Sequence, residues 1–219
     1  MKLLAFETAT DACSVALYVD GEILQRHELA PQRHTALVLP MVRELCAEAA
    51  LALRDLDAIA VGVGPGAFTG VRVATAIAQG LAYAHDLPVT AVSTLAALAQ
   101  GGLRLTGVGT VLATLDARRQ ELYWAVFDRG DDGLVRARDV ERVTPAVLLD
   151  LPGGADWRAV GTGWLSYAPE MGARWPDFGQ LPLLYPEAQD VATLGHAALC
   201  RGDGLDPALL SPTYLRAPV

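Results

Sequence analysis

An apolar run leads directly into a glycine-rich turn and then into a stretch of small residues, and this junction constrains the fold more than any other feature. Residues 58–63, Ala-Ile-Ala-Val-Gly-Val, have no polar face, which is typical of a strand buried on both sides. The turn runs from Gly64 to Gly70, where glycines permit positive φ and a close approach of the backbone. A helix is predicted over residues 70–85, with Thr69 as its cap. A buried strand joined to a helix in this way is a unit of α/β folds.

Three strands and a helix precede this junction, and a strand and a helix follow it. Asp20-Gly21 is a strong signal for a hairpin between the second and third strands. Pro40 removes one backbone hydrogen bond, so it is expected either to kink the first helix or to move its start to about residue 39. Ser93 and Thr94 are predicted to cap the last helix of this half. The predicted strands are residues 2–8, 12–19, 22–29, 58–63 and 88–92, and the predicted helices are residues 31–53, 70–85 and 94–101.

The same order of elements restarts in the second half of the chain. Thr144-Pro145 is predicted to be an N-cap with proline at the first helical position, opening a short helix. Residues 159–164 resemble residues 60–65 of the first junction. The predicted strands are residues 110–116, 121–128 and 134–143, with a hairpin turn at 129–133 and a helix at 189–201. We expect a structural duplication with its boundary within residues 101–109; the alternative is that strand–glycine–helix junctions look alike in any α/β fold.

Composition and charge limit the classes of function. Of the 219 residues, 52% are hydrophobic and 19% are charged, which favours a sizeable core over disorder. The formal charge is −8 and no window holds more than two adjacent basic residues, which argues against strong direct binding of nucleic acid. Lys2 is the only lysine, so a P-loop lysine is excluded. Three widely spaced cysteines, no signal peptide and no apolar run long enough for a bilayer indicate a cytoplasmic location.

The glycine turn has two interpretations. Free amides at a helix start suit a phosphate or a carboxylate, and Arg72 is close by in sequence, so the turn is a candidate anion or nucleotide site. The alternative is a tight turn that binds no ligand. The sequence matches neither the dinucleotide-binding glycine pattern nor the P-loop pattern.

The helix after the turn carries small residues at regular spacing. Gly70, Ala74, Ala78 and Ala82 recur every four residues, and Ala76, Gly80 and Ala84 add more. The preceding helix presents Leu37, Met41 and Leu45 at the same spacing. The two helices are therefore candidates for a pair that stacks on a second helix pair from another chain; the alternative is that they pack only on their own sheet.

The sequence contains no recognisable motif of catalytic residues. Glu7 and Asp116 each end the first strand of a half, where carboxylates could hold magnesium near phosphates. The alternative is that each carboxylate accepts hydrogen bonds from backbone amides at its own turn. No two histidines stand four residues apart, so no helical metal site is predicted. There is no G-x-S-x-G motif, and Cys13 and Cys46 are expected in the core.

Motifs along the whole chain, in order, resemble those of the TsaB (YeaZ) family. The glycine segment and the Asp-Ala-Arg segment are the most specific of them. The matching segments are Phe6-Glu7-Thr8-Ala9-Thr10, Cys13-Ser14-Val15-Ala16-Leu17, His34, Leu39-Pro40-Met41, Gly64-Pro65-Gly66-Ala67-Phe68-Thr69-Gly70-Val71-Arg72, Gly80-Leu81-Ala82, Val92-Ser93-Thr94-Leu95, Asp116-Ala117-Arg118, Glu121 with Tyr123, Gly161-Thr162-Gly163-Trp164 and Tyr214-Leu215-Arg216.

The resemblance implies a fold and a domain organisation. It implies two RNase H-like βββαβα domains of the actin-like ATPase superfamily. We expect them at residues 1–103, carrying the partner-docking helices, and at residues 104–219, with the final segment packing back on the first domain.

The resemblance also implies a role. Members of this family are non-catalytic partners of the TsaD enzyme. With the ATPase TsaE they transfer a threonylcarbamoyl group to N6 of adenosine 37 in tRNAs that read codons beginning with adenine. TsaD has a pair of metal-binding histidines on its first long helix, whereas this chain has His34 followed by Val38. Glu7 stands where the family commonly has aspartate, which makes magnesium–ATP binding less expected.

These implications fix the expected sites and partners. No catalytic residue, metal or cofactor is expected; the partners are TsaD and TsaE, with a homodimer in isolation and tRNA bound only through the complex. An ATP-binding kinase or ATPase of the same fold is the alternative, and a peptidase is a third class without a supporting motif. The predicted partner-binding residues are Leu37, Met41, Leu45, Gly70, Val71, Ala74, Ala78, Leu81 and Ala82. The candidates for vestigial phosphate turns are Glu7, Thr8, Gly64, Gly66, Thr69, Arg72 and Asp116.

Overall fold

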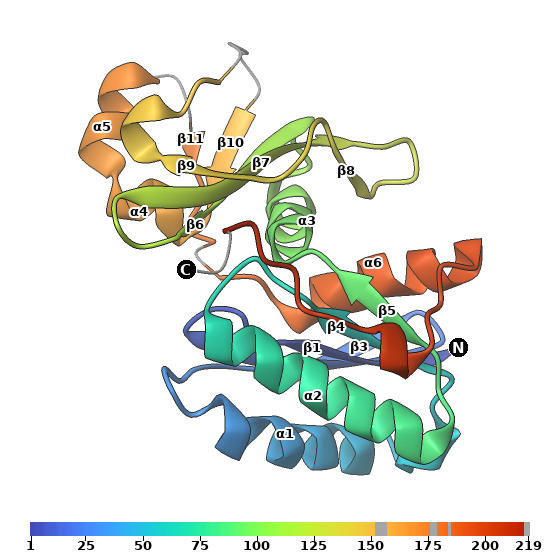
Figure 1. Ribbon diagram of the computed structural model, residues 1–219. Coiled ribbons are helices and arrows are strands. Elements are labelled where there is room, and N and C mark those ends of the chain that lie inside the picture. The colour runs from blue at the N-terminus through green and yellow to red at the C-terminus, as the bar shows by residue number, and fades with distance from the viewer. Residues whose placement is uncertain (152–156, 176–178, 184, 217–219) are drawn as a thin grey trace.

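Two mixed β-sheets with helices packed on them make up the protein (Figure 1). The computed structural model describes residues 1–151, 157–175, 179–183 and 185–216. Within those residues, no helix combines the length and the apolar character needed to cross a membrane.

The first sheet has the order β3-β2-β1-β4-β5. β1 and β4 form its parallel centre, with Phe6 opposite Val61, and β2 and β3 continue it antiparallel. Asp20 and Gly21 make the predicted hairpin turn between β2 and β3, both with positive φ. The strands are β1 (Lys2–Glu7), β2 (Ala12–Val19), β3 (Glu22–Leu29), β4 (Ala58–Gly62) and β5 (Val89–Val92).

The second sheet repeats this order as β11-β10-β6-β7-β8, with β9 also paired to β7. Read from the opposite edge, the second sheet has the same pairing as the first: the first strand of each half has antiparallel strands on one side and parallel strands on the other. The predicted duplication is therefore confirmed. The strands are β6 (Thr110–Asp116), β7 (Glu121–Arg129), β8 (Val135–Ala137), β9 (Arg142–Pro145), β10 (Trp157–Val160) and β11 (Gly179–Gln180).

Helices cover both faces of the first sheet (Figure 1). α1 (His34–Glu48) and α2 (Phe68–His85) lie on the face that carries Phe6 and Val61. α6 (Ala188–Arg201) lies on the opposite face, against Ala5 and Ala60. This alternation follows from the strand period of two.

Each half contributes one helix that packs on the sheet of the other half. α3 (Thr94–Thr106) belongs to the first half but packs on the second sheet, whereas α6 from the second half packs on the first sheet. Arg104 on α3 joins Asp190 on α6 through two nitrogen–oxygen contacts of 2.9 and 3.0 Å. The predicted boundary at residues 103 and 104 falls within α3 and stays a prediction.

Several element bounds differ from the sequence prediction. α1 begins at His34, includes Pro40 and ends at Glu48, so the predicted start near residue 39 is wrong. Its buried face, which includes Val38, Met41 and Leu45, offsets the one lost hydrogen bond. α2 begins at Phe68, two residues early.

α3 continues past the glycines at which it was expected to stop. A Cβ on Gly101 would lie 2.7 Å from a side-chain atom of Leu183, and one on Gly102 would lie 3.0 Å from Val160. These glycines therefore allow the helix to approach the second sheet closely and do not end it.

The third strand of the second half is split into β8 and β9. Thr144 and Pro145 belong to β9, so the predicted N-cap is wrong. Trp124 Nε1 donates to Thr144 Oγ1 at 2.9 Å, which occupies the hydroxyl that would have capped a helix. A 3-10 helix, η2 (Ala146–Leu148), follows; the other short helices are η1 (Leu53–Asp55), α4 (Thr162–Ser166), α5 (Ala168–Arg174) and η3 (Pro207–Leu209).

Candidate functional site

The glycine turn packs against the β1–β2 turn. A Cβ on Gly66 would lie 2.3 Å from the carbonyl oxygen of Ala9, and one on Gly70 would lie 2.0 Å from that of Thr8. The amide of Ala67 donates to Ala9 O at 2.7 Å, and Thr8 Oγ1 donates to Gly70 O at 2.7 Å. Close packing within the chain therefore accounts for these glycines, as in the tight-turn interpretation.

Thr69 does not cap α2. The N-cap position is Ala67, and no side chain accepts a hydrogen bond there. The prediction of Thr69 as the cap is wrong because the helix begins one residue before it. Ser93 does cap α3, accepting from the amides of Leu95 and Ala96 at 3.1 Å each.

Glu7 is fully buried in its own turn. Its Oε1 accepts from the amide of Ala9 at 2.7 Å and its Oε2 accepts from Thr94 Oγ1 at 3.0 Å. A Cβ on Gly62 would lie 2.0 Å from Oε2, so the missing side chain of Gly62 makes room for this carboxylate. Burial raises the pKa of Glu7 from 4.5 to about 7. The interpretation that the carboxylate serves its own turn is confirmed for Glu7.

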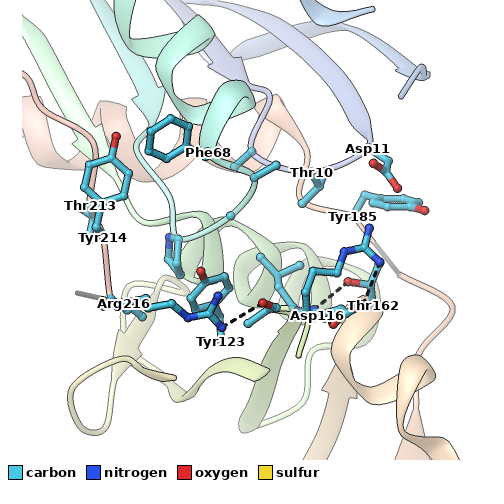
Figure 2. A pocket seen from close by; sticks show the side chains of 18 of the residues that line it. Thr10, Asp11, Phe68, Asp116, Tyr123, Thr162, Tyr185, Thr213, Tyr214 and Arg216 are labelled. Carbon is cyan, nitrogen blue, oxygen red and sulfur yellow. Dashed lines mark hydrogen bonds and ion pairs between the residues drawn. The ribbon is translucent and has the colours of Figure 1, made fainter. Parts of the chain in front are cut away.

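A cavity of about 800 Å³ lies between the two halves (Figure 2). Figure 2 shows Phe68 and Asp11 on one side of it and Tyr123 and Asp116 on the other. Its size is typical of small-molecule sites. It is lined by residues 9–11, residues 65–68 with Arg72, residues 115–118 with Tyr123, residues 162, 165 and 166 with Tyr185, and residues 213–216.

Most charges around this cavity are paired within the chain. Asp116 accepts from the backbone amide of Arg118 at 2.8 Å and from its guanidinium at 3.3 Å. Arg216 donates to Ala117 O at 3.1 Å and to Glu121. The cavity walls therefore need no ligand to balance these charges.

Arg72 packs against aromatic rings at the cavity rim. Its guanidinium carbon lies 3.1 Å from the ring centre of Phe68 and 5.4 Å from that of Tyr214. Such stacking stabilises an arginine without an acidic partner.

Only some of the candidate phosphate-turn residues line the same cavity. Gly66, Arg72 and Asp116 line the cavity. Thr69 lines a neighbouring cavity of about 420 Å³ instead. Glu7, Thr8 and Gly64 line neither cavity, because all three are buried. Glu7 and Asp116 therefore do not face the same cavity. Phe68 and Tyr214 were missed as lining residues, although both lie within the quoted motifs.

The predicted partner-binding residues mostly face inward, so most of them are not exposed for contact with another chain, while the prediction that these helices carry a docking surface stays a prediction. Leu45 and the alanines 74, 78 and 82 have no exposed area, and Val71 and Met41 are 1% and 7% exposed. Gly70 is also buried, whereas Leu37 and Leu81 are half-buried. The reason is steric: the stripe of small residues lets α2 lie close to its own sheet, beside Phe6 and Val61.

A different face of the two helices is partly open to solvent. We define the outer helix face as Leu37, Pro40, Val73, Ala76, Ile77, Gly80, Leu81 and Ala84, all half-buried or exposed. On α2 these residues recur every three or four positions, so they form a second stripe of small and apolar residues beside the buried one. A Cβ on Gly80 would have no neighbouring atom within 4 Å.

His34 is buried against β2. It is 9% exposed, and its Nε2 lies 3.2 Å from Ala12 O. Val38, four residues on, is fully buried. Across the described ranges, no group of three or more histidine, cysteine or acidic residues is arranged to hold a metal ion.

Comparison with known proteins identifies the family. Residues 25–192 match the family model described as "TsaD: tRNA N6-adenosine threonylcarbamoyltransferase". The "tRNA threonylcarbamoyladenosine biosynthesis protein TsaB" of Escherichia coli strain K12 is 38% identical over 99% of this chain and 95% of its own length. The protein of that name from Haemophilus influenzae is 42% identical over 77% of this chain and 75% of its own.

A solved structure agrees with the sequence comparison. "YeaZ from Pseudomonas aeruginosa" superposes with a TM-score of 0.91 at 44% identity, covering 98% of this chain and 99% of that one. Identity and structural similarity extend over both halves, as the resemblance predicted. The chain therefore belongs to the TsaB (YeaZ) family.

Proposed function

We propose that this chain is a non-catalytic subunit for threonylcarbamoyl transfer to N6 of adenosine 37 in tRNAs, acting with TsaD and TsaE. Curated relatives bear a name of that pathway, and a model of the transferase family matches residues 25–192. The place that holds the TsaD histidine pair in the resemblance has His34 and the buried Val38 here. The catalytic residues are therefore assigned to TsaD, and this chain supplies a docking surface.

The observation that carries the proposal is Gly80 on the outer helix face. Glycine inside a helix costs about 0.5–1 kcal/mol relative to alanine. Among the described residues, no atom outside the neighbouring backbone of α2 lies within 4 Å of the Cβ position, so their packing gives no reason for this cost. A second backbone that approaches α2 at Gly80 would explain it.

The occupant of this face is the helix pair of a TsaD-type subunit. Matching folds offer matching helix pairs, and small side chains at Ala76, Gly80 and Ala84 permit close helix–helix packing. A second copy of this chain has the same helix pair, so a homodimer in isolation uses the same surface. The two assemblies are mutually exclusive under this proposal.

Gly80→Leu tests the surface directly. Leucine has the higher helix propensity and an open position to occupy, so the folded monomer should be at least as stable as the wild type. Gly80→Ala is the matched control because it makes the same gain in propensity with little added bulk. With TsaD-type and TsaE-type subunits from the same organism, wild type and Gly80→Ala should co-elute with TsaD and restore tRNA modification, and Gly80→Leu should do neither. Unchanged binding by Gly80→Leu would refute the assigned face.

A further inference from the structure

The C-terminal segment crosses from the first sheet to the second half of the protein. We call residues 205–216 the C-terminal strap; in Figure 1 it is the red chain that passes α2 and reaches the second sheet. It begins at the sheet edge, where Val89 and Leu205 exchange two backbone hydrogen bonds of 3.0 and 2.8 Å. Leu210 is 3% exposed and belongs to the core cluster beneath α2. The amide of Thr213 then donates to Val63 O at 2.8 Å.

Gln79 fastens this strap to α2. Its Nε2 donates to Pro207 O at 3.1 Å and to Leu210 O at 3.0 Å. Both hydrogens of this side-chain amide thus form hydrogen bonds to the strap, at two carbonyl oxygens three residues apart. Gln79 is half-buried and lies outside the outer helix face.

The far end of the strap is fastened to the second half. Arg216 donates to Ala117 O at 3.1 Å and forms an ion pair with Glu121. Between the two ends, the rings of Tyr214 and Phe68 lie 5.9 Å apart. The strap therefore connects the first turn and the middle of α2 to β7 and the turn before it.

α2 needs such a fastening because its inward side chains are short. Alanines 74, 78 and 82 face the sheet, beside the buried Val71 and Thr75. Short side chains form shallower ridges than long ones, so they position a helix on its sheet less sharply. Two directed hydrogen bonds from Gln79 fix the helix along its axis far more sharply.

We propose that the C-terminal strap is the positioning element of the docking helix, with Gln79 and Arg216 as its positioning residues. The inference rests on the proposed docking of TsaD at the outer helix face. Neither residue contacts the partner; each acts by holding α2 at the depth and angle that the partner helix requires. The second half of the chain thereby determines a binding surface that lies on the first.

The test compares Gln79→Met and Arg216→Met with the wild type. Methionine keeps the length of glutamine but donates no hydrogen bond. Each variant should remain folded and should bind the TsaD-type subunit about tenfold more weakly, a coupling of ordinary size. Gln79→Lys, which restores a donor, should recover most of the affinity. Gln180→Met, at an exposed glutamine on β11, is the matched control and should leave affinity unchanged.

Hydrogen exchange supplies a readout that does not depend on TsaD. The Thr213 amide and the amides of α2 should exchange about tenfold faster in Gln79→Met than in the wild type, because the strap opens more often. If wild type fails to bind TsaD, the proposed function fails and exchange alone decides on the strap. Unchanged exchange, or loss of affinity from Gln79→Met without any from Arg216→Met, overturns the inference.

Discussion

Replacing Glu7 with glutamine is expected to flatten the dependence of stability on pH. The carboxyl group is fully buried, and burial raises its pKa from 4.5 to about 7 in the folded protein. A raised pKa means that the folded state holds the proton more tightly than the unfolded state. The resulting stabilisation is complete below pH 4.5 and is lost as the pH rises through 7.

The size of the effect follows from the two pKa values. Each unit of difference corresponds to about 1.4 kcal/mol, and between pH 5 and pH 8 the expected loss in the wild type is about 2.5 kcal/mol. Glutamine does not ionise, and its amide has both a donor for Thr94 Oγ1 and an acceptor for the amide of Ala9. The Glu7→Gln variant should therefore lack this loss.

Urea unfolding at pH 5, 6, 7 and 8 measures the difference. The free energy of unfolding of Glu7→Gln minus that of the wild type should rise by about 2.5 kcal/mol across this range. Asp11→Asn, at an exposed carboxylate in the turn after β1, is the matched control and should show no such rise. Parallel pH curves for wild type and Glu7→Gln would show that the pKa of Glu7 is the same in the folded and unfolded states, contrary to the increase expected from burial.

Two further results are expected from the burial of small side chains. Ala78→Leu should lower the free energy of unfolding by about 1–3 kcal/mol, because Ala78 is fully buried and leucine overpacks the core; urea unfolding checks this, and full stability would place Ala78 at the surface. A thiol reagent should modify Cys200 quickly in the folded protein and the other two cysteines only after unfolding, since burial raises the pKa of Cys13 to about 11; mass spectrometry of the labelled chain checks this, and early labelling of Cys13 would contradict it.

The inward position of most predicted docking residues changes how the alanine-rich helix is understood. Both stripes of α2, one through Ala74 and Ala78 and the other through Ala76 and Gly80, are small and helically spaced. The buried stripe lets α2 lie close to its own sheet, whereas the outer stripe is open to another chain. Close packing of α2 on its own sheet explains why the buried positions of this helix carry small side chains.

The sequence by itself determined the features that depend on neighbouring residues. The Asp20-Gly21 hairpin, the Ser93 cap and the repeated order of strands were all predicted, because turn chemistry, capping and strand periodicity act over a few residues. The family followed from motifs spread along the whole chain. The bounds that failed, at Pro40 and Thr144-Pro145, are places where packing overrode a local preference.

Only the tertiary structure decided which face of α2 is buried and which distant groups bond to Glu7 and Gln79. Both faces of α2 carry small and apolar residues at helical spacing, so periodicity alone does not distinguish the buried face from the partly exposed one. The Glu7 carboxylate accepts a hydrogen bond from Thr94, which lies 87 residues away in the chain. The Gln79 amide donates to carbonyls that lie 128 and 131 residues away. Such contacts form only when the sheets and helices have assembled, because no local sequence pattern specifies which distant residues will lie next to one another.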